Sequence, residues 1–488
     1  MRGYAEVELV ATARRGGTTS SSSDGRGARH RWVKAPSNRK GCSGEMRLTT
    51  RTARSLSRSA ELREKAHRLI PAGAHTYSKG DDQFPANAPG FIERGRGSRV
   101  WDVDGNEYLD WGMGLRSVIL GHAYQAVLDA VRAELDRGSN FVRPSPIEVK
   151  LAERLATLIP SAEMVKFAKN GSDVTTAAVR LARAATGRDY VAICADNPFF
   201  SIDDWFIGTT PADSGIPEAF KRLSLTFRYN DLATLSRLFD AYPGQIAAVI
   251  LEPMNFVAPR GGFLQGVRKL CTSNGALMIL DEIITGFRFG VGGAQARFGV
   301  TPDLSTFGKS LGNGFSISAV VGRRDVMELG GLHHSKPRVF LLSTTNGGET
   351  HSIAASIATL TELESKDVPS HLDRIGRALT QGVDSLASEL GIHEHVHFIG
   401  EPCSPHMMFF DKDGQSSNEL RTLFAQEMIE AGVLAGYFAP SFSHSAGDVD
   451  ETLSAARRAL PIVREAIDRG VAGLLRGPAV KPVFRRFN

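Results

Sequence analysis

The sequence contains little cysteine. Four cysteines occur among 488 residues and no two of them form a C-x-x-C pair; they are Cys42, Cys194, Cys271 and Cys403. Zinc sites and disulfide frameworks both need cysteines at short, regular spacing, so this scatter argues against either. We therefore expect no metal, and we expect the protein in a reducing compartment, the cytoplasm.

Three further absences narrow the class of protein. No apolar run approaches membrane-spanning length, no segment is repeated, and no stretch after residue 60 interleaves basic with aromatic residues as nucleic-acid sites do. With 42% hydrophobic and 23% charged residues, the composition is that of a globular protein large enough for two or three lobes. We expect small-molecule partners, and neither nucleic acid nor membrane.

The net charge of +5 hides an uneven distribution. The first 60 residues hold 13 Lys or Arg and four acidic residues, so they carry +9 and the remainder carries −4. The stretch "RRGGTTSSSSDGRGARHRWVKAPSNRK" has no apolar periodicity, which predicts a disordered basic tail over residues 1–45. A nucleic-acid arm, an organelle transit peptide or a translation start at Met46 would each explain this tail; we favour the last, with the transit peptide second.

From about residue 60 the pattern becomes regular. The stretch "SRVWDVDGNEYLDW" predicts a hairpin that turns at Asp104 and Gly105. Apolar runs such as "EMVKFAK" and "DYVAICA" then alternate with helical segments such as "SDVTTAAVRLARAATG", which predicts an α/β fold with a mostly parallel sheet and helices on both faces. We expect a large domain over 116–343, and a smaller α+β lobe that joins 46–115 to 344–488.

The stretch "LMILDEIITGFRFG" places two carboxylates directly after an apolar run. Leu277 to Leu280 have the pattern of a strand buried on both faces, so Asp281 falls at its carboxyl end. Ligands bind at that edge of open α/β sheets. The alternative is a solvated acidic pair that opens a loop, since charges are mostly exposed.

A lysine between glycines follows in "LSTFGKSLGNGF". Gly308, Lys309 and Ser310 resemble a phosphate-binding P-loop, but that motif needs glycine where this chain has Asp303. An amine can instead form a Schiff base with pyridoxal phosphate, whose ring nitrogen needs an acid beside it. Asp281 and Lys309 supply that pair.

The phosphate of such a cofactor also needs a binding place. In "AKNGSDVTTAAVRLARAATG", apolar residues recur at helical spacing, so Gly171 and Ser172 lie at the amino end of a helix. Free backbone N–H groups and the positive end of the helix dipole favour an anion there. Most helix starts bind no ligand, so this signal is weak when taken alone.

Four stretches together resemble one family. They are "LMILDEIITGFR", "PDLSTFGKSLGNG", "NGSDVTTAAVRLARAATGR" and "AAVILEP", and they are similar to the class III aminotransferases, pyridoxal-phosphate enzymes of fold type I. The subgroup that the chain most resembles is that of glutamate-1-semialdehyde 2,1-aminomutase, from about residue 60 to about 470. The resemblance implies that Lys309 is the Schiff-base lysine, Asp281 the partner of the ring nitrogen, and Gly171 with Ser172 the phosphate contacts.

The resemblance extends to three further residues. Phe199 stands where the family has the aromatic residue that stacks on the cofactor ring, with Phe200 in place of a histidine. Thr345 stands where the family contacts the phosphate of the partner subunit, which implies a homodimer with a shared active site. Glu252 resembles a family glutamate near the cofactor; the alternative is an exposed charge at a strand end.

The departures from the aminomutase concern the substrate. Thr76 and Lys79 stand where that enzyme has a Ser and an Arg that bind the substrate carboxylate, and a lysine lacks the two-point grip of arginine. Val257 stands in place of an asparagine, with Asn255 displaced.

We therefore predict an aminotransferase that moves an amino group from an amino-acid donor to an aldehyde, ketone or keto-sugar. The two adjacent rings of Phe199 and Phe200 favour an acceptor with apolar or sugar-ring faces. One alternative is the aminomutase itself. A remote one is a non-catalytic binding protein of this fold, against which the retention of both Asp281 and Lys309 argues.

Overall fold

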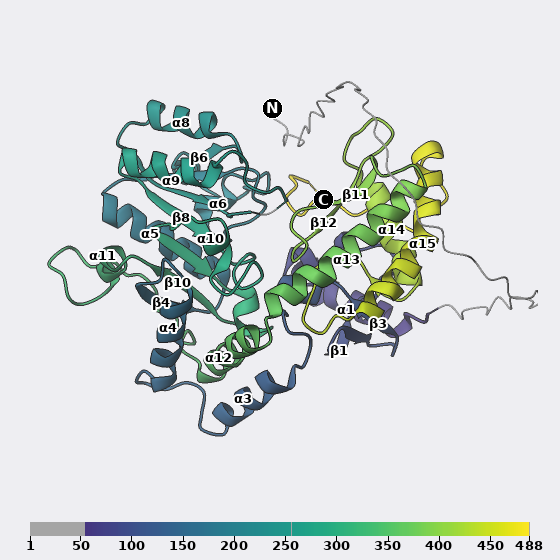
Figure 1. Cartoon of the computed structure of the whole chain (residues 1–488), viewed down its shortest axis with the longest axis horizontal. Helices are drawn as coiled ribbons and strands as arrows, with labels where there is room; N and C mark the ends of the chain where they lie inside the picture. Colours follow the sequence, from purple (N-terminus) through teal and green to yellow (C-terminus); the bar gives the residue numbers. More distant parts are fainter. Residues whose placement is uncertain (1–53, 255, 488) are drawn as a thin grey trace, which may run out of the picture. The chain divides into compact units, whose positions relative to one another are not determined.

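A seven-stranded sheet organises the chain in the computed structural model (Figure 1). The structure describes residues 54–254 and 256–487, so the predicted tail, Met46 and Asn255 lie outside the described residues. β10 runs antiparallel to its neighbours β4 and β9, and the other pairings are parallel, which confirms the mostly parallel sheet. The strands in sheet order are β4 (Met164–Ala168), β10 (Ser318–Gly322), β9 (Leu304–Phe307), β8 (Leu277–Asp281), β7 (Ile246–Leu251), β5 (Tyr190–Cys194) and β6 (Ser224–Phe227).

Both faces of this sheet are covered by helices because successive residues of its central strands are all apolar. Ile250 of β7 and Ile279 of β8 pack in the core beneath α5 (Gly171–Thr186). Their neighbours Leu251 and Leu280 point to the other face, toward α8 (Leu232–Ala241) and α9 (Phe263–Asn274). The predicted helices of this region are therefore confirmed.

A third core lies beside the sheet, where α3 (Gln125–Leu135), α4 (Pro146–Leu158) and α12 (Thr350–Ser365) pack together. Its buried residues include Val127, Leu151 and Ile353. α4 has a Ser145–Glu148 capping box that the sequence reading did not use. α12 thus shares a core with elements of the predicted large domain, and the predicted boundaries at 116 and 344 stay predictions.

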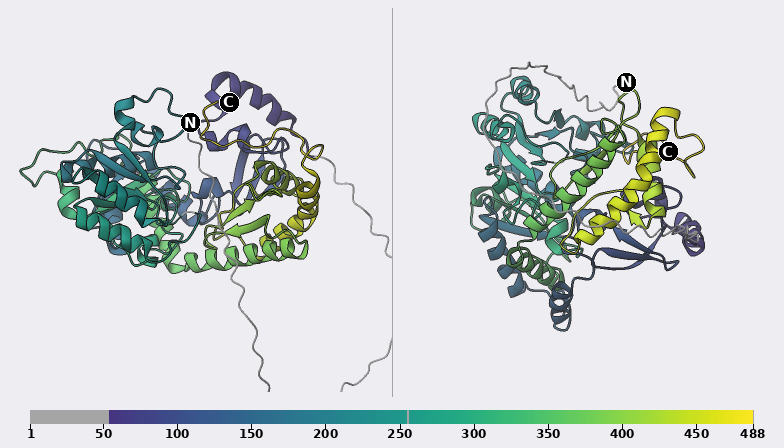
Figure 2. Two further views of the ribbon diagram at one scale, coloured as in Figure 1. Left: turned by 90° about the horizontal axis from the view of Figure 1, so that it is seen from above. Right: turned by 45° about the vertical axis from the view of Figure 1, so that its right-hand side comes forward.

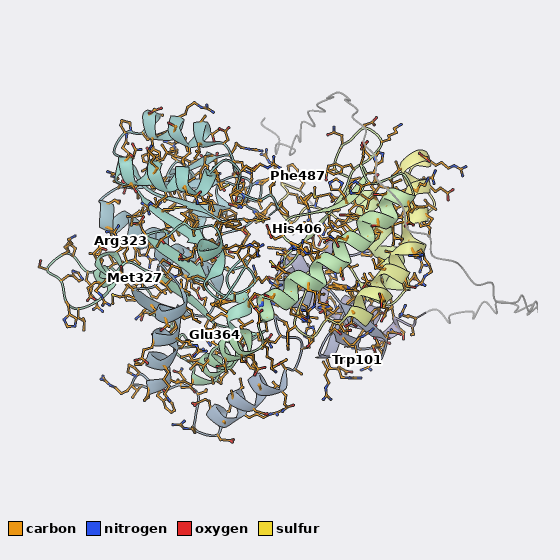
Figure 3. All side chains as sticks on the ribbon, viewed as in Figure 1. Trp101, Arg323, Met327, Glu364, His406 and Phe487 are labelled. Atoms are coloured by element: carbon orange, nitrogen blue, oxygen red, sulfur yellow. The ribbon has the colours of Figure 1, made fainter. Side chains whose placement is uncertain are left out.

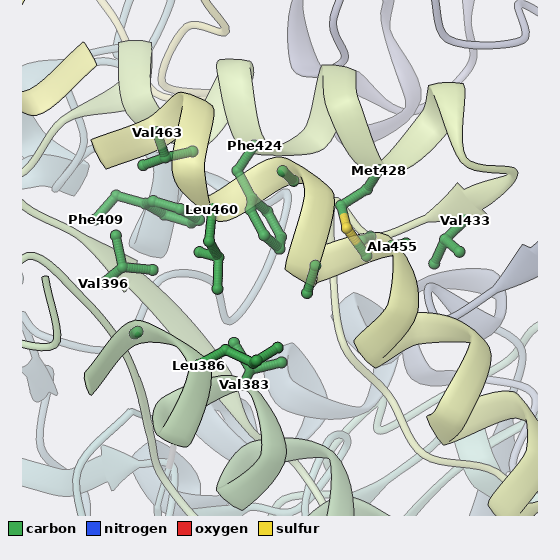
Figure 4. Close-up of a cluster of buried hydrophobic side chains, with 14 of the residues drawn as sticks. Val383, Leu386, Val396, Phe409, Phe424, Met428, Val433, Ala455, Leu460 and Val463 are labelled. Atoms are coloured by element: carbon green, nitrogen blue, oxygen red, sulfur yellow. The ribbon is translucent and has the colours of Figure 1, made fainter. Parts of the chain in front are cut away.

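The smaller lobe uses both ends of the chain, as predicted. β1 (Ile92–Arg96), β2 (Arg99–Asp102) and β3 (Glu107–Asp110) form the predicted hairpin and its extension, and β13 (Val433–Leu434) adds in parallel beside β3. A second small sheet pairs β11 (Val396–Ile399) with β12 (His406–Phe409). Three helices enclose an apolar core (Figure 4): α13 (Val368–Glu389), α14 (Asn418–Glu430) and α15 (Ala446–Arg469).

These helices and the seven-stranded sheet occupy opposite sides of the molecule (Figure 2). The remaining helices are short except for α1 (Ser57–Leu69). They are α2 (Met113–Arg116), α6 (Asp204–Ile207), α7 (Glu218–Lys221), α10 (Gly293–Arg297), α11 (Arg324–Met327), and the 3-10 turns η1 (Pro71–Gly73), η2 (Tyr77–Lys79), η3 (Asp81–Gln83), η4 (Lys309–Gly312) and η5 (Glu328–Gly330).

The C-terminal segment, residues 471–487, ties several distant parts of the chain together. The Val480 N–H donates to Thr422 Oγ1 at 2.9 Å and the Lys481 N–H to the carbonyl of Asp82 at 2.9 Å. Arg485 forms an ion pair with Asp82 at 2.6 Å. The segment therefore links α14 with η3.

Within residues 54–254 and 256–487, no helix is long and apolar enough to cross a membrane. The three cysteines found there are buried free thiols, and burial raises the pKa of Cys271 to about 12.

Candidate active site

Asp281 and Lys309 come from adjacent parallel strands. Asp281 is the last residue of β8 and pairs with Thr306 of β9. Lys309 follows two residues after the end of β9 and begins η4, with a left-handed φ of 42°. The register of the sheet therefore brings both side chains to the carboxyl edge, where the sequence predicted a site.

Asp281 is a buried carboxylate and not a solvated loop acid, since its exposed fraction is 4%. Its Oδ1 accepts hydrogen bonds from the Ile283 N–H at 3.0 Å and from Thr306 Oγ1 at 2.9 Å. Burial raises the pKa of Asp281 to about 6, against the opposing effects of these two bonds and of Lys309. A cationic partner would stabilise the ionised form of this buried carboxyl group.

Glu282, the next residue, has a different role. Its carboxylate accepts bonds from the Ala294 N–H at 2.6 Å, the Gln295 N–H at 2.9 Å and Thr285 Oγ1 at 2.9 Å. It is fully buried and fixes the start of α10. Of the acidic pair noted in the sequence, only Asp281 belongs to the candidate site.

Lys309 is partly buried among charges of both signs. Burial lowers its pKa; the carboxylates of Glu252 and Asp281 oppose this effect, and the guanidinium groups of Arg116 and Arg288 reinforce it. A lowered pKa increases the fraction of neutral amine, the nucleophilic form.

Glu252 follows β7 and has an exposed fraction of 2%, so the alternative of an exposed strand-end charge is wrong. Its N–H donates to Asn197 Oδ1 at 3.0 Å. Its carboxylate acts electrostatically on Lys309 and Arg116. Glu252 therefore belongs with the charged groups around the lysine.

The amino end of α5 contacts the loop that holds Asp281. A Cβ on Gly171 would lie 2.7 Å from Ile283 Cδ1, so a larger residue there would have to displace the end of the Ile283 side chain. Ile283 is also the residue whose N–H binds Asp281. Ser172 is buried and its Oγ accepts from the Ile202 N–H at 3.1 Å. Ile283 thus contacts both the start of α5, where the phosphate is predicted to bind, and the predicted acid Asp281.

The two adjacent phenylalanines face different surroundings. Phe199 is 42% exposed, with its ring edge-on to Phe206 and stacked on Phe484 of the C-terminal segment at a centroid distance of 6.4 Å. Phe200 is buried and packs against Phe206 and Trp205. The expectation that both rings line the site is wrong for Phe200, whose side chain packs into the core, and the irregular segment around it has no period that fixes which ring points inward.

Thr345 lies in an exposed loop. Its carbonyl accepts from Asn140 Nδ2 at 3.3 Å. A contact with a partner subunit is not tested by one chain, so its role stays a prediction.

The positions that differ from the aminomutase lie in loops. Thr76 is partly buried, while Lys79 is exposed and forms no ion pair with a described residue. Val257 is partly buried in the loop after β7.

The sequence reading missed Arg116 and His406. Arg116 Nη2 lies 2.9 Å from His406 Nε2, and Arg116 is a buried residue. His406 begins β12 and lies between the seven-stranded sheet and the C-terminal helices (Figure 3). No motif marks either residue, and only the fold brings them together.

The residues present fit pyridoxal phosphate on three counts. Lys309 supplies an amine whose pKa is lowered by burial. Asp281 supplies a buried carboxylate that a protonated ring nitrogen would satisfy. Gly171 supplies a helix start with no side chain, and the first N–H groups of a helix have no acceptor within it.

The comparisons with known proteins agree with this fit. The aminotransferase class-III family model matches residues 83–460. Glutamate-1-semialdehyde 2,1-aminomutase of Desulforamulus reducens is 35% identical over 430 residues, covering 83% of this chain and 98% of that protein. The FumI protein of Sphingopyxis sp. MTA144 has a TM-score of 0.77 at 28% identity, covering 87% of this chain and 99% of its own. An omega-transaminase of Sphaerobacter thermophilus has a TM-score of 0.75 at 26% identity, covering 83% and 98%. This chain therefore belongs to the class III aminotransferases, and its cofactor is pyridoxal 5'-phosphate.

Proposed function

We propose that this enzyme transfers an amino group from an amino-acid donor to an aldehyde, ketone or keto-sugar on a second molecule. The observation that carries the chemistry is the pair of Asp281 and Lys309 at neighbouring strand ends, one a buried acid and the other an amine of lowered pKa. The family membership stands behind the reaction class.

Each residue of the site has a proposed role. Lys309 would hold the cofactor through Nζ and, when that atom is free, would take up and return a proton with it. Asp281 lies beside the ring nitrogen and keeps it protonated, with Thr306 and Ile283 fixing the carboxylate. Bound pyridoxal phosphate supplies an electron sink for the bond that breaks at the substrate carbon.

The remaining residues bind and orient. Gly171 and Ser172 hold the phosphate at the start of α5, where the helix dipole is positive. Phe199 covers one face of the ring, since its own ring is the exposed member of the aromatic pair. Glu252 lies close enough to Lys309 to favour its charged form.

Transfer between two molecules is favoured over isomerisation by the substrate positions. Lys79 stands where the aminomutase has its carboxylate-binding arginine, and it is exposed. Val257 offers a branched alkyl group where that enzyme has an amide. Losing a planar two-point contact costs on the order of a few kcal/mol of substrate binding.

The aminomutase is the second candidate because 35% identity over 98% of that enzyme from Desulforamulus reducens is a specific likeness. One experiment separates the two. The holoenzyme is mixed with glutamate-1-semialdehyde alone and, separately, with L-glutamate or L-alanine, while the absorption of the bound cofactor is followed. A half-reaction with an amino-acid donor is expected. Rapid formation of 5-aminolevulinate without any donor half-reaction would restore the aminomutase.

We also propose a homodimer in which Thr345 binds the cofactor phosphate of the partner subunit. Phe141, Val142 and Phe340 have exposed apolar side chains, and exposed apolar groups favour association. The first two follow Asn140, whose side chain donates to the Thr345 carbonyl, and Phe340 precedes the Thr345 loop in the sequence. A hydroxyl bond to phosphate is worth about 1.5–3 kcal/mol, so Thr345→Val should weaken cofactor binding roughly ten- to a hundredfold. A fully active monomer in sedimentation would contradict the shared site.

A further inference from the structure

Arg116 is a buried cation with few partners. The residue is 8% exposed, and its guanidinium forms no ion pair with any carboxylate of residues 54–254 and 256–487. Its Nε is buried and has no hydrogen-bond partner among them. Burial lowers the pKa of Arg116, which reflects the cost of placing a charge there without a close counter-ion.

Among the described residues, His406 has the only side chain that accepts a hydrogen bond from this guanidinium, and that side chain is neutral. Arginine has no acceptor atom, so Arg116 Nη2 donates and His406 Nε2 carries the lone pair. Burial and the neighbouring Arg116 hold the pKa of His406 well below its usual range. The ring of Phe256 lies edge-on to His406 at 4.3 Å between centroids. His406 thus orients Arg116 without neutralising it.

Arg116 lies next to the turn that carries Lys309, because its carbonyl accepts from Ser310 Oγ at 3.2 Å. Its charge lowers the pKa of Lys309, and Glu252 acts on both residues. The charged groups that act most on Lys309 are two carboxylates, Glu252 and Asp281, and two guanidinium groups, Arg116 and Arg288. The two carboxylates balance the two guanidinium groups, but Asp281 is proposed to pair with the cofactor's ring nitrogen, and neither carboxylate forms an ion pair with Arg116 among the described residues.

Arg288 is a buried arginine whose hydrogen bonds indicate a structural role. Arg288 Nη1 donates to the carbonyls of Cys403 at 3.2 Å and Pro440 at 2.9 Å, and its Nη2 donates to the carbonyl of Arg116 at 3.3 Å. Three main-chain carbonyls thus accept from the Nη atoms of Arg288, although its Nε, like that of Arg116, has no partner; Arg116 donates to no main-chain carbonyl among the described residues.

The backbone of Arg116 is held in place at some cost. Its φ is 72°, in the left-handed region that residues other than glycine rarely adopt. Its carbonyl accepts from Ser310 Oγ at 3.2 Å, one residue after Lys309, and from Arg288. Residues with a strained backbone that is held in place by surrounding hydrogen bonds are found mainly at functional sites.

We propose that Arg116 is the residue that binds a carboxylate of the substrate, with His406 as the positioning residue that leaves its charge unpaired. This inference rests on the proposed aminotransferase function and names a substrate class for it, a carboxylate-bearing amine or its carbonyl counterpart. A planar carboxylate suits a guanidinium because two parallel N–H groups can donate to its two oxygens. Arg116 and the exposed Lys79 belong to different segments, so this site is not the one that the arginine of the aminomutase forms.

The test compares ligands that differ only in the carboxylate. Binding of propionate and of propionamide, which cannot react, is measured on the holoenzyme by calorimetry. In parallel, L-alanine and L-alaninamide are compared as amino donors through the absorption of the bound cofactor. The wild type should prefer each acid over its amide by roughly ten- to a hundredfold, as charge-assisted bonds imply. Arg116→Gln should abolish the preference and keep the reaction with L-alaninamide.

Two variants complete the design. Arg116→Lys keeps the charge but not the planar fork, so an intermediate preference is expected. Arg132→Gln removes an exposed cation on α3 and should leave the preference unchanged. An Arg116→Gln protein that keeps its cofactor and the full preference for acids would overturn the inference. If that variant does not fold, a folded Arg116→Lys with wild-type preference overturns it instead.

The proposed function can fail separately. A wild type that binds propionate through Arg116 but gives no half-reaction with any amine would contradict the aminotransferase proposal and leave the carboxylate site supported.

Discussion

Two segments bring charged side chains to Lys309 by opposite means. Asp281 stands at the end of β8, where the ladder with β9 sets its position. Arg116 stands in the segment 113–116, whose four residues all have left-handed φ values between 43° and 72°. Asp281 thus lies on regular structure and Lys309 lies two residues past the neighbouring strand, whereas the residue proposed for substrate binding lies on an irregular segment that can vary while the sheet stays the same.

The strand edge should be the more sensitive of the two regions, and Lys309→Ala should have the largest effect. Loss of the covalent and proton-transfer group should lower turnover on the order of 10⁴-fold or more. Borohydride reduction and peptide mapping of the wild type should find the cofactor on Lys309. Lys150→Ala, at an exposed position of α4, is the control. Attachment to another lysine would refute the assignment.

Asp281→Asn should lower turnover on the order of 10²–10³-fold, because it removes a fixed charge but keeps the Oδ1 that accepts from Ile283 and Thr306. Near wild-type turnover would show that Asp281 does not act on the cofactor.

The same variant should change stability in the opposite direction. Burial raises the pKa of Asp281 from 3.8 to about 6 in the folded state, so ionisation opposes folding. The free energy of unfolding should therefore be highest below pH 3.8 and should fall by about 3 kcal/mol as the pH rises through about 6. Cofactor-free Asp281→Asn should therefore be more stable than cofactor-free wild type at pH 7 and not at pH 3.5, as measured by urea unfolding.

Thr306→Val should have a smaller effect on the same edge. It removes the hydroxyl that donates to Asp281 at 2.9 Å and keeps the shape of the strand. A bond to a charged group is worth about 1.5–3 kcal/mol, part of which should appear as a roughly tenfold loss of turnover. Thr306→Ser retains the hydroxyl and should retain activity. Equal activity of the two variants would mean that this bond does not matter for catalysis.

The smallest effect is expected in the irregular segment, from Leu115→Gly. Glycine tolerates the left-handed φ of 59°, but it gains freedom in the unfolded chain, so stability should change by less than about 1 kcal/mol. Propionate binding should weaken severalfold because Arg116 is then held less firmly. Leu332→Gly, in an exposed loop, is the matched control. Unchanged propionate binding would show that the neighbouring backbone does not position Arg116.

The sequence was informative where residues follow regular periods. The continuous apolar run before Asp281 predicted a buried strand, and the helical spacing after Gly171 predicted α5, both of which the structure contains. Phe200 was misplaced because an irregular segment gives no rule for which side chain points inward. Arg116 and His406 come from residues far apart in the chain, in a strained turn and a short strand, so no local pattern joins them. The basic tail, the start at Met46, the role of Thr345 and the cytoplasmic location stay predictions.

The C-terminal segment also has a consequence for how the molecule is assembled. Its contacts with Asp82 and Phe199 join residues hundreds of positions apart, and closing so long a loop is entropically costly, so this segment should dock late in folding. Arg485 would then be open to trypsin in a partly folded chain and protected once its ion pair with Asp82 has formed. Cleavage at this arginine would report, in a single peptide, whether the last part of the chain has reached its place beside Phe199.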